Sequence, residues 1–185
     1  MALSVLSPDA TKLAQFEQIV MPHLNAAYNL ARWLMRNEHD AEDVVQEAYL
    51  RAFRFFDGFQ GGDGRGWLLA IVRNSCRTLL RQSGGRESAA EFDEQMHSAR
   101  APGSDPEERM LRQTGIDSVR HCIDGLPAEY REVIVLRELE EMSYKEIAEA
   151  ASVPLGTVMS RLARARARLQ DCLSLHSRRP GEVRA

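Results

Sequence analysis

The sequence predicts an all-α protein with two small helical domains joined by a flexible linker, the second containing a helix-turn-helix. Apolar residues recur every three or four positions along several segments, and no segment shows the sustained alternation expected of a strand. Residues 83–104 interrupt these patterns with glycine, proline and scattered charge, as a linker does. Near the C-terminus, two short amphipathic segments follow each other with only a tight turn between them.

The composition sets limits on the class of protein. The 185 residues are 44% hydrophobic and 28% charged, which suits one domain or two small ones that stay soluble. The net charge of −3 argues against indiscriminate coating of nucleic acid and fits local basic patches on an acidic body. No apolar run is long enough for a membrane span, and the N-terminus lacks the pattern of a secretory signal, so we expect a cytoplasmic protein.

The cysteines fit the same compartment. Cys76, Cys122 and Cys172 are odd in number and widely spaced, so we expect reduced, mostly buried thiols. No CxxC motif or Cys/His cluster is visible in the sequence, and we expect neither a metal nor another cofactor.

The first domain is expected over residues 13–82, after a disordered segment at residues 1–12. Its first helical stripe, for which we expect a kink at Pro22, consists of Phe16, Val20, Leu24, Ala27, Ala31 and Leu34. The next helix, residues 40–56, faces inward through Val45, Ala48, Tyr49, Ala52 and Phe56. On its outer side acids precede bases in the favourable order: Asp43 and Glu47, then Arg51 and Arg54.

A third helix is expected over residues 66–82, after a glycine-rich loop flanked by aromatics at residues 59–67. The helix buries Leu68, Ile71, Val72, Ser75 and Leu79 and carries arginines at spacing four, Arg73, Arg77 and Arg81. As a phosphate cradle the loop lacks a preceding strand and a Lys-Ser/Thr pair. A plain surface turn remains open, as does a pocket for unstacked bases of a single strand.

The second domain is expected over residues 105–173, followed by a short disordered tail at residues 174–185. Asp105 and Pro106 begin one helix and Leu126-Pro127 the next, whose apolar positions are Tyr130, Val133, Ile134 and Leu136. Ser143 and Glu146 form a capping box that begins the first helix of the helix-turn-helix. Pro154 can open the second.

The last helix carries two stripes. Its apolar side consists of Val158, Leu162, Ala165 and Leu169, and the same spacing sets Thr157, Arg161, Arg164 and Arg168 on another face. The arginines of this stretch, Arg166 included, have no acidic residue among them, although the whole protein is acidic. A helix with one packing side and one arginine-rich side suits entry into a DNA major groove. A basic surface on an all-α core is the plainer alternative.

Three blocks in this order resemble extracytoplasmic-function (ECF) sigma factors, the small two-domain specificity subunits of bacterial RNA polymerase. DAEDVVQEAYLRAF resembles the family's polymerase-binding helix, and RGWLLAIVRNSCRTLLRQ its promoter-melting and minus-ten segment. The stretch from LPAEYREVIVL to RLARARARL resembles its domain four. The match covers residues 16–173 apart from the linker. It implies binding to core RNA polymerase and promoter DNA, both duplex and melted, and control by an anti-sigma protein.

The resemblance implies site residues of three kinds. The core-polymerase face would be Asp40, Asp43, Gln46, Glu47, Leu50 and Arg51. The minus-ten residues would be Gln60, Arg65, Trp67, Arg73, Asn74, Arg77 and Arg81. The minus-thirty-five residues would be Ser143, Tyr144, Gly156, Thr157, Ser160, Arg161, Arg164 and Arg168. Met159 stands where the family often has a basic residue and Thr78 where it often has an acidic one, which with the glycine-rich loop leaves the promoter preference open.

Other functions fit the sequence less well. The acids beside His39 lack HExxH spacing, and the other histidines have no nucleophile motif near them, so we expect no catalysis. A stand-alone helix-turn-helix regulator is the main alternative; such proteins bind operators as dimers without polymerase. An adaptor whose basic helices bind an acidic protein is a third.

Overall fold

The computed structural model describes residues 8–82 and 106–177. Across these residues all elements are helices, which confirms the all-α prediction. The first part contains α1 (Pro8–Ile19), η1 (Met21–His23), α2 (Leu24–Met35), α3 (Glu38–Phe55), η2 (Phe56–Gly58) and α4 (Gly64–Gln82). The second contains α5 (Pro106–Asp124), α6 (Ala128–Ile134), the π-helical turn η4 (Val135–Leu139), α7 (Tyr144–Ala151) and α8 (Leu155–Ser177). The expected linker, residues 83–104, and Asp105 lie outside the described residues.

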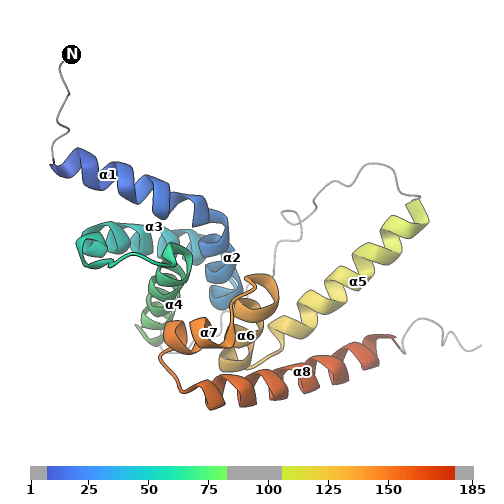
Figure 1. Ribbon diagram of the computed structural model, residues 1–185. Coiled ribbons are helices and arrows are strands. Elements are labelled where there is room, and N and C mark those ends of the chain that lie inside the picture. Colours follow the sequence, from blue (N-terminus) through green and yellow to red (C-terminus); the bar gives the residue numbers. More distant parts are fainter. Residues whose placement is uncertain (1–7, 83–105, 178–185) are drawn as a thin grey trace, which may run out of the picture.

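In the first domain α2, α3 and α4 pack against one another, and α1 lies across one end (Figure 1). The predicted stripe is buried except for Leu24, whose side chain is 42% exposed. Pro22 does not kink a continuous helix, as expected, but lies in the short η1 turn that separates α1 from α2. Because a 3₁₀ turn winds more tightly than an α-helix, it shifts the phase of the stripe and turns Leu24 outward.

Side-chain caps begin the next two helices earlier than the sequence suggested. Asn37 accepts a hydrogen bond of 3.0 Å from the backbone N–H of Asp40, so α3 begins at Glu38. The Asp63 carboxylate accepts from the backbone N–H groups of Arg65 and Gly66, so α4 begins at Gly64. At Gly64 a Cβ would lie 2.5 Å from the Ile19 side chain, so only glycine permits this close approach to the end of α1.

The second domain contains the predicted helix-turn-helix in α7 and α8. Both hydrogen bonds of the Ser143–Glu146 capping box are present, and Pro154 immediately precedes α8. Val158, Leu162 and Ala165 are fully buried and Leu169 packs against the core, which confirms the apolar side of α8. At the domain limits the helices run further than expected: α1 already begins at Pro8, and α8 ends at Ser177.

The two domains pack together, which the sequence did not predict. α7 lies against α4, α6 lies against α2, and one cluster of buried apolar residues continues through both domains (Figure 1). Arg131 of α6 donates hydrogen bonds to the carbonyl of Trp33 in α2 and to the carbonyls of Asp124 and Leu126 in its own domain. None of the described helices is both apolar and long enough to span a bilayer.

The prediction of three reduced cysteines is wrong for two of them. Cys122 and Cys172 form a disulfide between α5 and α8, although 50 residues separate them in the chain. Their spacing carries no signal, because only the crossing of the two helices brings them together. Cys76 is a free, fully buried thiol, and burial raises its pKa to about 12.

Candidate functional site

The outer face of α3 is open along the predicted polymerase-binding residues. Asp43, Gln46, Glu47 and Leu50 are exposed, while Asp40 and Arg51 are partly so. Glu47 and Arg51 form the predicted i,i+4 ion pair at 3.0 Å. Leu50 is 66% exposed, and no other described element covers it. A single exposed leucine is ordinary on a protein surface, so its meaning depends on whether other apolar side chains lie beside it.

An apolar groove lies beside this face. It has a volume of about 580 Å³ between α1, η1 and α3, and Leu13, Met21, Leu50 and Phe53 are among the residues that line it. Exposed apolar side chains that gather in one groove mark an interaction site more often than scattered ones do. The α3 face therefore combines charge, which can orient a partner, with apolar area, which can hold it.

The glycine-rich loop encloses a pocket. Gly61 and Gly62 have φ angles of 84° and 96°, a conformation that glycine adopts without strain. The ring of Phe59 lies 5.1 Å from that of Trp67, and both line a pocket of about 420 Å³ that Gln60 also borders. An aromatic pair beside a hollow can stack a base. The pocket is bordered on its other side by α7, through Glu146 and Glu149.

Arg73 does not lie on an open basic stripe with Arg77 and Arg81, as the spacing had suggested. Its side chain is 3% exposed and forms an ion pair with the buried Glu132 of α6. A second hydrogen bond joins it to the side chain of neighbouring Asn74. Arg77 and Arg81, one and two turns later, are exposed, as is Asn74. Of the seven residues expected to contact the minus-ten element, Arg73 is therefore already paired with the second domain.

A second ion pair joins the domains at the start of α4. Arg65 contacts the Glu140 carboxylate at 2.6 Å and also donates to the Glu140 backbone carbonyl. Burial raises the pKa of Glu140, although hydrogen bonds from Arg65 and from Asn29 of α2 favour its ionised form. Glu140 lies just after the π-helical turn η4, and such turns often occur at functional sites. A further predicted minus-ten residue is thus held by the second domain.

The basic residues of α4 and α8 approach each other. Burial lowers the pKa of Arg77, and the positive charges of Arg73, Arg81 and Arg161 lower it further. Arg161 belongs to α8, and the carboxylate of Glu132 opposes these positive charges by raising the pKa of Arg77. Such a concentration of positive charge attracts a polyanion.

The helix-turn-helix presents its predicted contact side to solvent. Gly156, Ser160, Arg164 and Arg168 are exposed, as is Ser143, whereas Tyr144, Thr157 and Arg161 are partly covered. The arginines have acidic neighbours that the sequence of α8 does not reveal. Arg161 lies 3.3 Å from Glu129 of α6 and Arg166 lies 2.7 Å from Glu138 of η4. Arg168 stacks over the ring of Tyr130 at 5.4 Å.

Two family models match the chain. Sigma-70 region 2 matches residues 19–86, and Sigma-70 region 4 matches residues 116–169. The first match contains the α3 face and the loop pocket, and the second contains the helix-turn-helix. The two matches are therefore in the order expected from the resemblance.

Curated relatives give the same result. The chain is 36% identical over 175 residues to the ECF RNA polymerase sigma factor SigE of Mycolicibacterium smegmatis, covering 91% of this chain and 65% of that protein. It therefore spans slightly less than two thirds of that relative's length. It is 39% identical over 134 residues to the ECF RNA polymerase sigma-E factor of Escherichia coli, covering 69% of this chain and 70% of that one. RNA polymerase sigma-H factor of Pseudomonas aeruginosa is 32% identical, with 85% and 86% covered.

Two solved structures of protein complexes contain a chain with the same fold. The sigma factor RpoE of Bartonella quintana, bound to the anti-sigma factor NepR, superposes with a TM-score of 0.69 at 27% identity, covering 86% of this chain and 97% of that one. CnrH, in complex with the cytosolic domain of CnrY, superposes with a TM-score of 0.60 at 28% identity, covering 88% and 90%.

Proposed function

The chain belongs to the family of ECF RNA polymerase sigma factors, and we propose that it binds core RNA polymerase and directs transcription initiation at specific promoters. The observation that carries this proposal is the pairing, in one chain, of an uncovered charged and apolar face on α3 with an arginine-bearing helix-turn-helix. A stand-alone regulator needs the second feature but has no use for the first. The proposed role is one of binding, and it places the protein in the cytoplasm with polymerase and DNA.

We assign the polymerase contact to the α3 face. Leu50 and the adjoining groove supply apolar area, and Asp43, Glu47 and Arg51 supply charge at its edge. This division resembles the apolar centre and polar rim of known protein interfaces.

We assign the two promoter elements to different domains. The pocket beside Phe59 and Trp67 takes an unstacked minus-ten base, and Arg77 and Arg81 hold the strand by its phosphates. In the second domain Thr157, Ser160, Arg161 and Arg164 enter the minus-thirty-five major groove. An arginine that is bidentate to guanine contributes about 1–3 kcal/mol of discrimination there.

This assignment requires the domains to separate on the promoter. Elements centred about 25 base pairs apart lie ~85 Å apart along B-DNA, at ~3.4 Å per base pair. In the arrangement described here, Arg65 and Arg73 of one domain instead touch Glu140 and Glu132 of the other. Acidic Glu146 and Glu149 also border the pocket proposed for a base. The closed contact is therefore incompatible with both elements being bound at once.

An anti-sigma protein is the proposed regulator, by analogy with the complex of RpoE and the anti-sigma factor NepR. A groove of about 840 Å³ between the domains could take part of it. The groove is lined by Asn29 and Trp33 of α2, by Ile116 and Val119 of α5 and by Leu139 of η4. Such a partner would bind the closed arrangement and keep the DNA-binding residues covered.

The test of the polymerase contact is a double substitution, Asp43→Ala with Leu50→Ala. Neither side chain is buried, so helicity by circular dichroism should not change, while affinity for core polymerase should fall at least about tenfold. Asp171→Ala with Leu175→Ala is the matched control, since Leu175 is 65% exposed on α8. Equal polymerase affinity of both variants would remove the α3 assignment. Promoter-specific run-off transcription that needs both the chain and core polymerase separates the proposal from a stand-alone regulator.

A further inference from the structure

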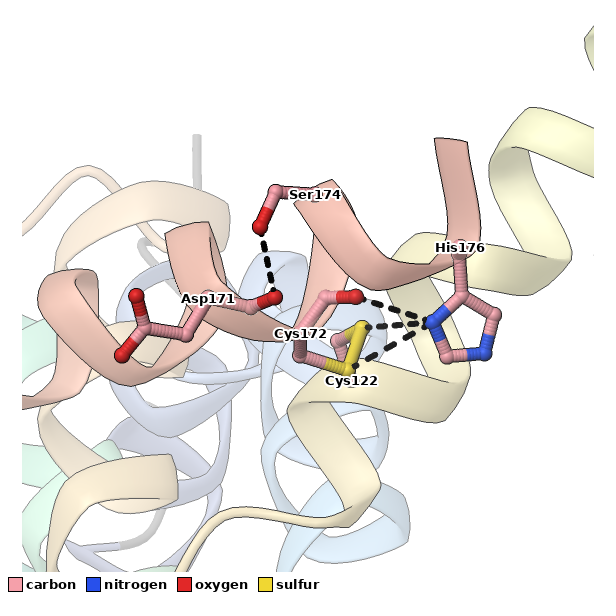
Figure 2. The surroundings of a disulfide bond; sticks show 5 residues. All are labelled: Cys122, Asp171, Cys172, Ser174 and His176. Atoms are coloured by element: carbon pink, nitrogen blue, oxygen red, sulfur yellow. Dashed lines mark hydrogen bonds between the residues drawn. A yellow bond between two sulfur atoms is a disulfide. The ribbon is translucent and has the colours of Figure 1, made fainter. Parts of the chain in front are cut away.

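The disulfide between α5 and α8 lies in a cluster of potential metal ligands. Figure 2 shows the His176 ring directed at both sulfur atoms, with Nδ1 3.9 Å from Cys122 Sγ and 3.8 Å from Cys172 Sγ. The two sulfur atoms and a His176 nitrogen all lie within 4.8 Å of one another. The ring of His121 lies 5.2 Å from that of His176.

The distances in this cluster are close to those of a metal site. In a tetrahedral site with Zn–S of ~2.3 Å and Zn–N of ~2.0 Å, sulfur and nitrogen ligands lie ~3.5 Å apart. The two observed sulfur–nitrogen distances exceed this by only a few tenths of an ångström. Once the disulfide is reduced, the cysteine side chains must rotate to move the two sulfur atoms to ~3.8 Å from each other, the separation of two thiolates on one tetrahedral ion.

The surroundings also favour a metal. Cys122 is buried, Cys172 and His176 are half-buried, and His121 is exposed, so the cluster is protected on one side and open to solvent on the other. Two thiolates and an imidazole form a donor set that suits zinc. Figure 1 shows the N-terminal end of α5 and the C-terminal end of α8 extending away from the rest of the molecule. Helix α5 packs mainly against α8, so a link between them fastens α5 to a helix that α6 and α7 already hold.

We propose that the reduced thiols of Cys122 and Cys172 bind one Zn²⁺ together with His176, and that oxidation exchanges the metal for the disulfide. His121 is positioned to approach the fourth coordination site. In the disulfide form Nδ1–H of His176 donates to the Cys172 carbonyl at 2.9 Å. In the metal form the ring proton resides on Nε2, which leaves the Nδ1 lone pair for the ion.

The redox step balances with a peroxide as oxidant. The two zinc-bound thiolates give up two electrons and form the S–S bond. Hydrogen peroxide takes these electrons and two protons and becomes two water molecules, and Zn²⁺ is released. The site does not depend on the proposed function, because none of its residues belongs to the proposed polymerase or promoter surfaces. Only the expectation of reduced thiols in the cell follows from that function.

The test uses the full chain in two redox states. Reduced protein, incubated with Zn²⁺ and freed of unbound metal, should retain one zinc per chain by elemental analysis. Peroxide-treated protein should retain none. With Co²⁺ as the probe, the reduced chain should show thiolate-to-cobalt charge transfer and the strong visible bands of a tetrahedral site. Because both states use the unchanged sequence, no variant has to fold for this comparison.

Substitutions then identify the ligands. Cys172→Ser and His176→Ala should each weaken zinc binding by about 100-fold or more, since loss of an outer-shell partner alone costs about 10–100-fold. Cys76→Ala is the matched control, because it removes a buried thiol outside the cluster and should leave zinc binding unchanged. Substoichiometric zinc in the reduced wild type would overturn the proposal. So would full zinc retention after oxidation, or in either ligand variant.

Discussion

Arginines recur every three or four residues along both α4 and α8, yet they have different surroundings. On α4, Arg73 is buried against a carboxylate of the other domain. On α8, Arg161 and Arg166 pair with carboxylates of their own domain, and those pairs remain partly exposed. The exposed pairs are screened by solvent and are each worth about 0–1 kcal/mol. The buried pair instead makes a proposed DNA-binding residue part of the contact between domains. The basic side of α8 is therefore largely exposed, whereas that of α4 is partly covered by the other domain.

The largest effect on this difference between α4 and α8 is expected from removing the buried carboxylate of Glu132, the partner of Arg73. Glu132→Gln leaves the Arg73 guanidinium buried without its charge partner, and breaking such a pair costs about 3–5 kcal/mol. We expect the domain contact to open rather than the helices to melt, since α2, α3 and α4 pack together within the first domain and α6, α7 and α8 within the second. Small-angle scattering should then give a larger radius of gyration, with unchanged helicity by circular dichroism.

Glu129→Gln is the matched control for that experiment. Glu129 lies on the same helix, three residues earlier, but its pair with Arg161 is exposed. This variant should keep the compact dimensions of the wild type. If both variants are equally compact, Arg73 does not hold the domains together and the contrast between α4 and α8 disappears.

The next largest effect concerns the two sides of α8. Leu162 is 1% exposed, so Leu162→Ala should lower the free energy of unfolding of the second domain by about 2–5 kcal/mol through a core cavity. Arg161→Ala should change stability by no more than about 1 kcal/mol, yet abolish minus-thirty-five recognition. Denaturant titrations and duplex binding separate the two. An Arg161→Ala variant that melts like Leu162→Ala would require the DNA-facing side to be redrawn.

A smaller effect tests the open part of α4. Arg77→Ala and Arg81→Ala should each lower the salt dependence of non-template-strand binding by about 0.7 in the logarithmic slope, since each removes one phosphate contact. For a short single strand that engages only the first domain, Arg73→Ala should leave that slope unchanged, because in the closed arrangement the wild-type Arg73 guanidinium pairs with Glu132 and not with a phosphate. Titrations at several salt concentrations give the slopes directly. A slope that does not change for Arg77→Ala would make this stripe an ordinary solvated surface.

The smallest expected effect concerns the start of α7, which faces the α4 pocket. Ser143→Ala should lower stability by about 1 kcal/mol, because it removes a helix cap. Hydrogen bonds with Ser143 lower the pKa of Glu146 below its usual value of 4.5. A carboxyl group whose pKa is lowered by folding stabilises the protein at pH values above its pKa in the unfolded state. This contribution is lost as the pH falls through its pKa in the folded state. The difference between wild type and Ser143→Ala should therefore shrink below about pH 4 in thermal melts.

Local features were predictable from the sequence because they depend on neighbours in the chain. The capping box at Ser143 and the apolar stripe from Val158 to Leu169 follow from spacing alone, and both are confirmed. The break at Pro22 was underestimated as a kink. A proline marks an interruption, but the phase of the next helix depends on how tightly the chain turns there.

Long-range pairing was not predictable. The partners of Arg73 and Arg65 lie 59 and 75 residues away, and the partner of Cys122 lies 50 residues away. Nothing near these residues in the chain distinguishes an arginine that will meet a distant carboxylate from one that will meet a phosphate. Within the Cys/His cluster, Cys172 and His176 are one helical turn apart on α8, but Cys122 and His121 reach them only because α5 and α8 cross. The polymerase, minus-ten and minus-thirty-five assignments remain predictions.

The contact between Arg73 and Glu132 also sets a threshold for every partner that needs the domains apart. Such a partner binds only the open fraction of the molecules, and its apparent dissociation constant rises by the inverse of that fraction. Each 1.4 kcal/mol by which closure is favoured weakens the apparent affinity about tenfold. Short DNA that binds a single domain has only the binding energy of that domain's contacts to set against the cost of separating the domains. A polymerase and a full promoter that engage both domains together can meet that threshold with their combined binding energy. A buried ion pair would in this way help the protein to distinguish a complete promoter complex from stray DNA.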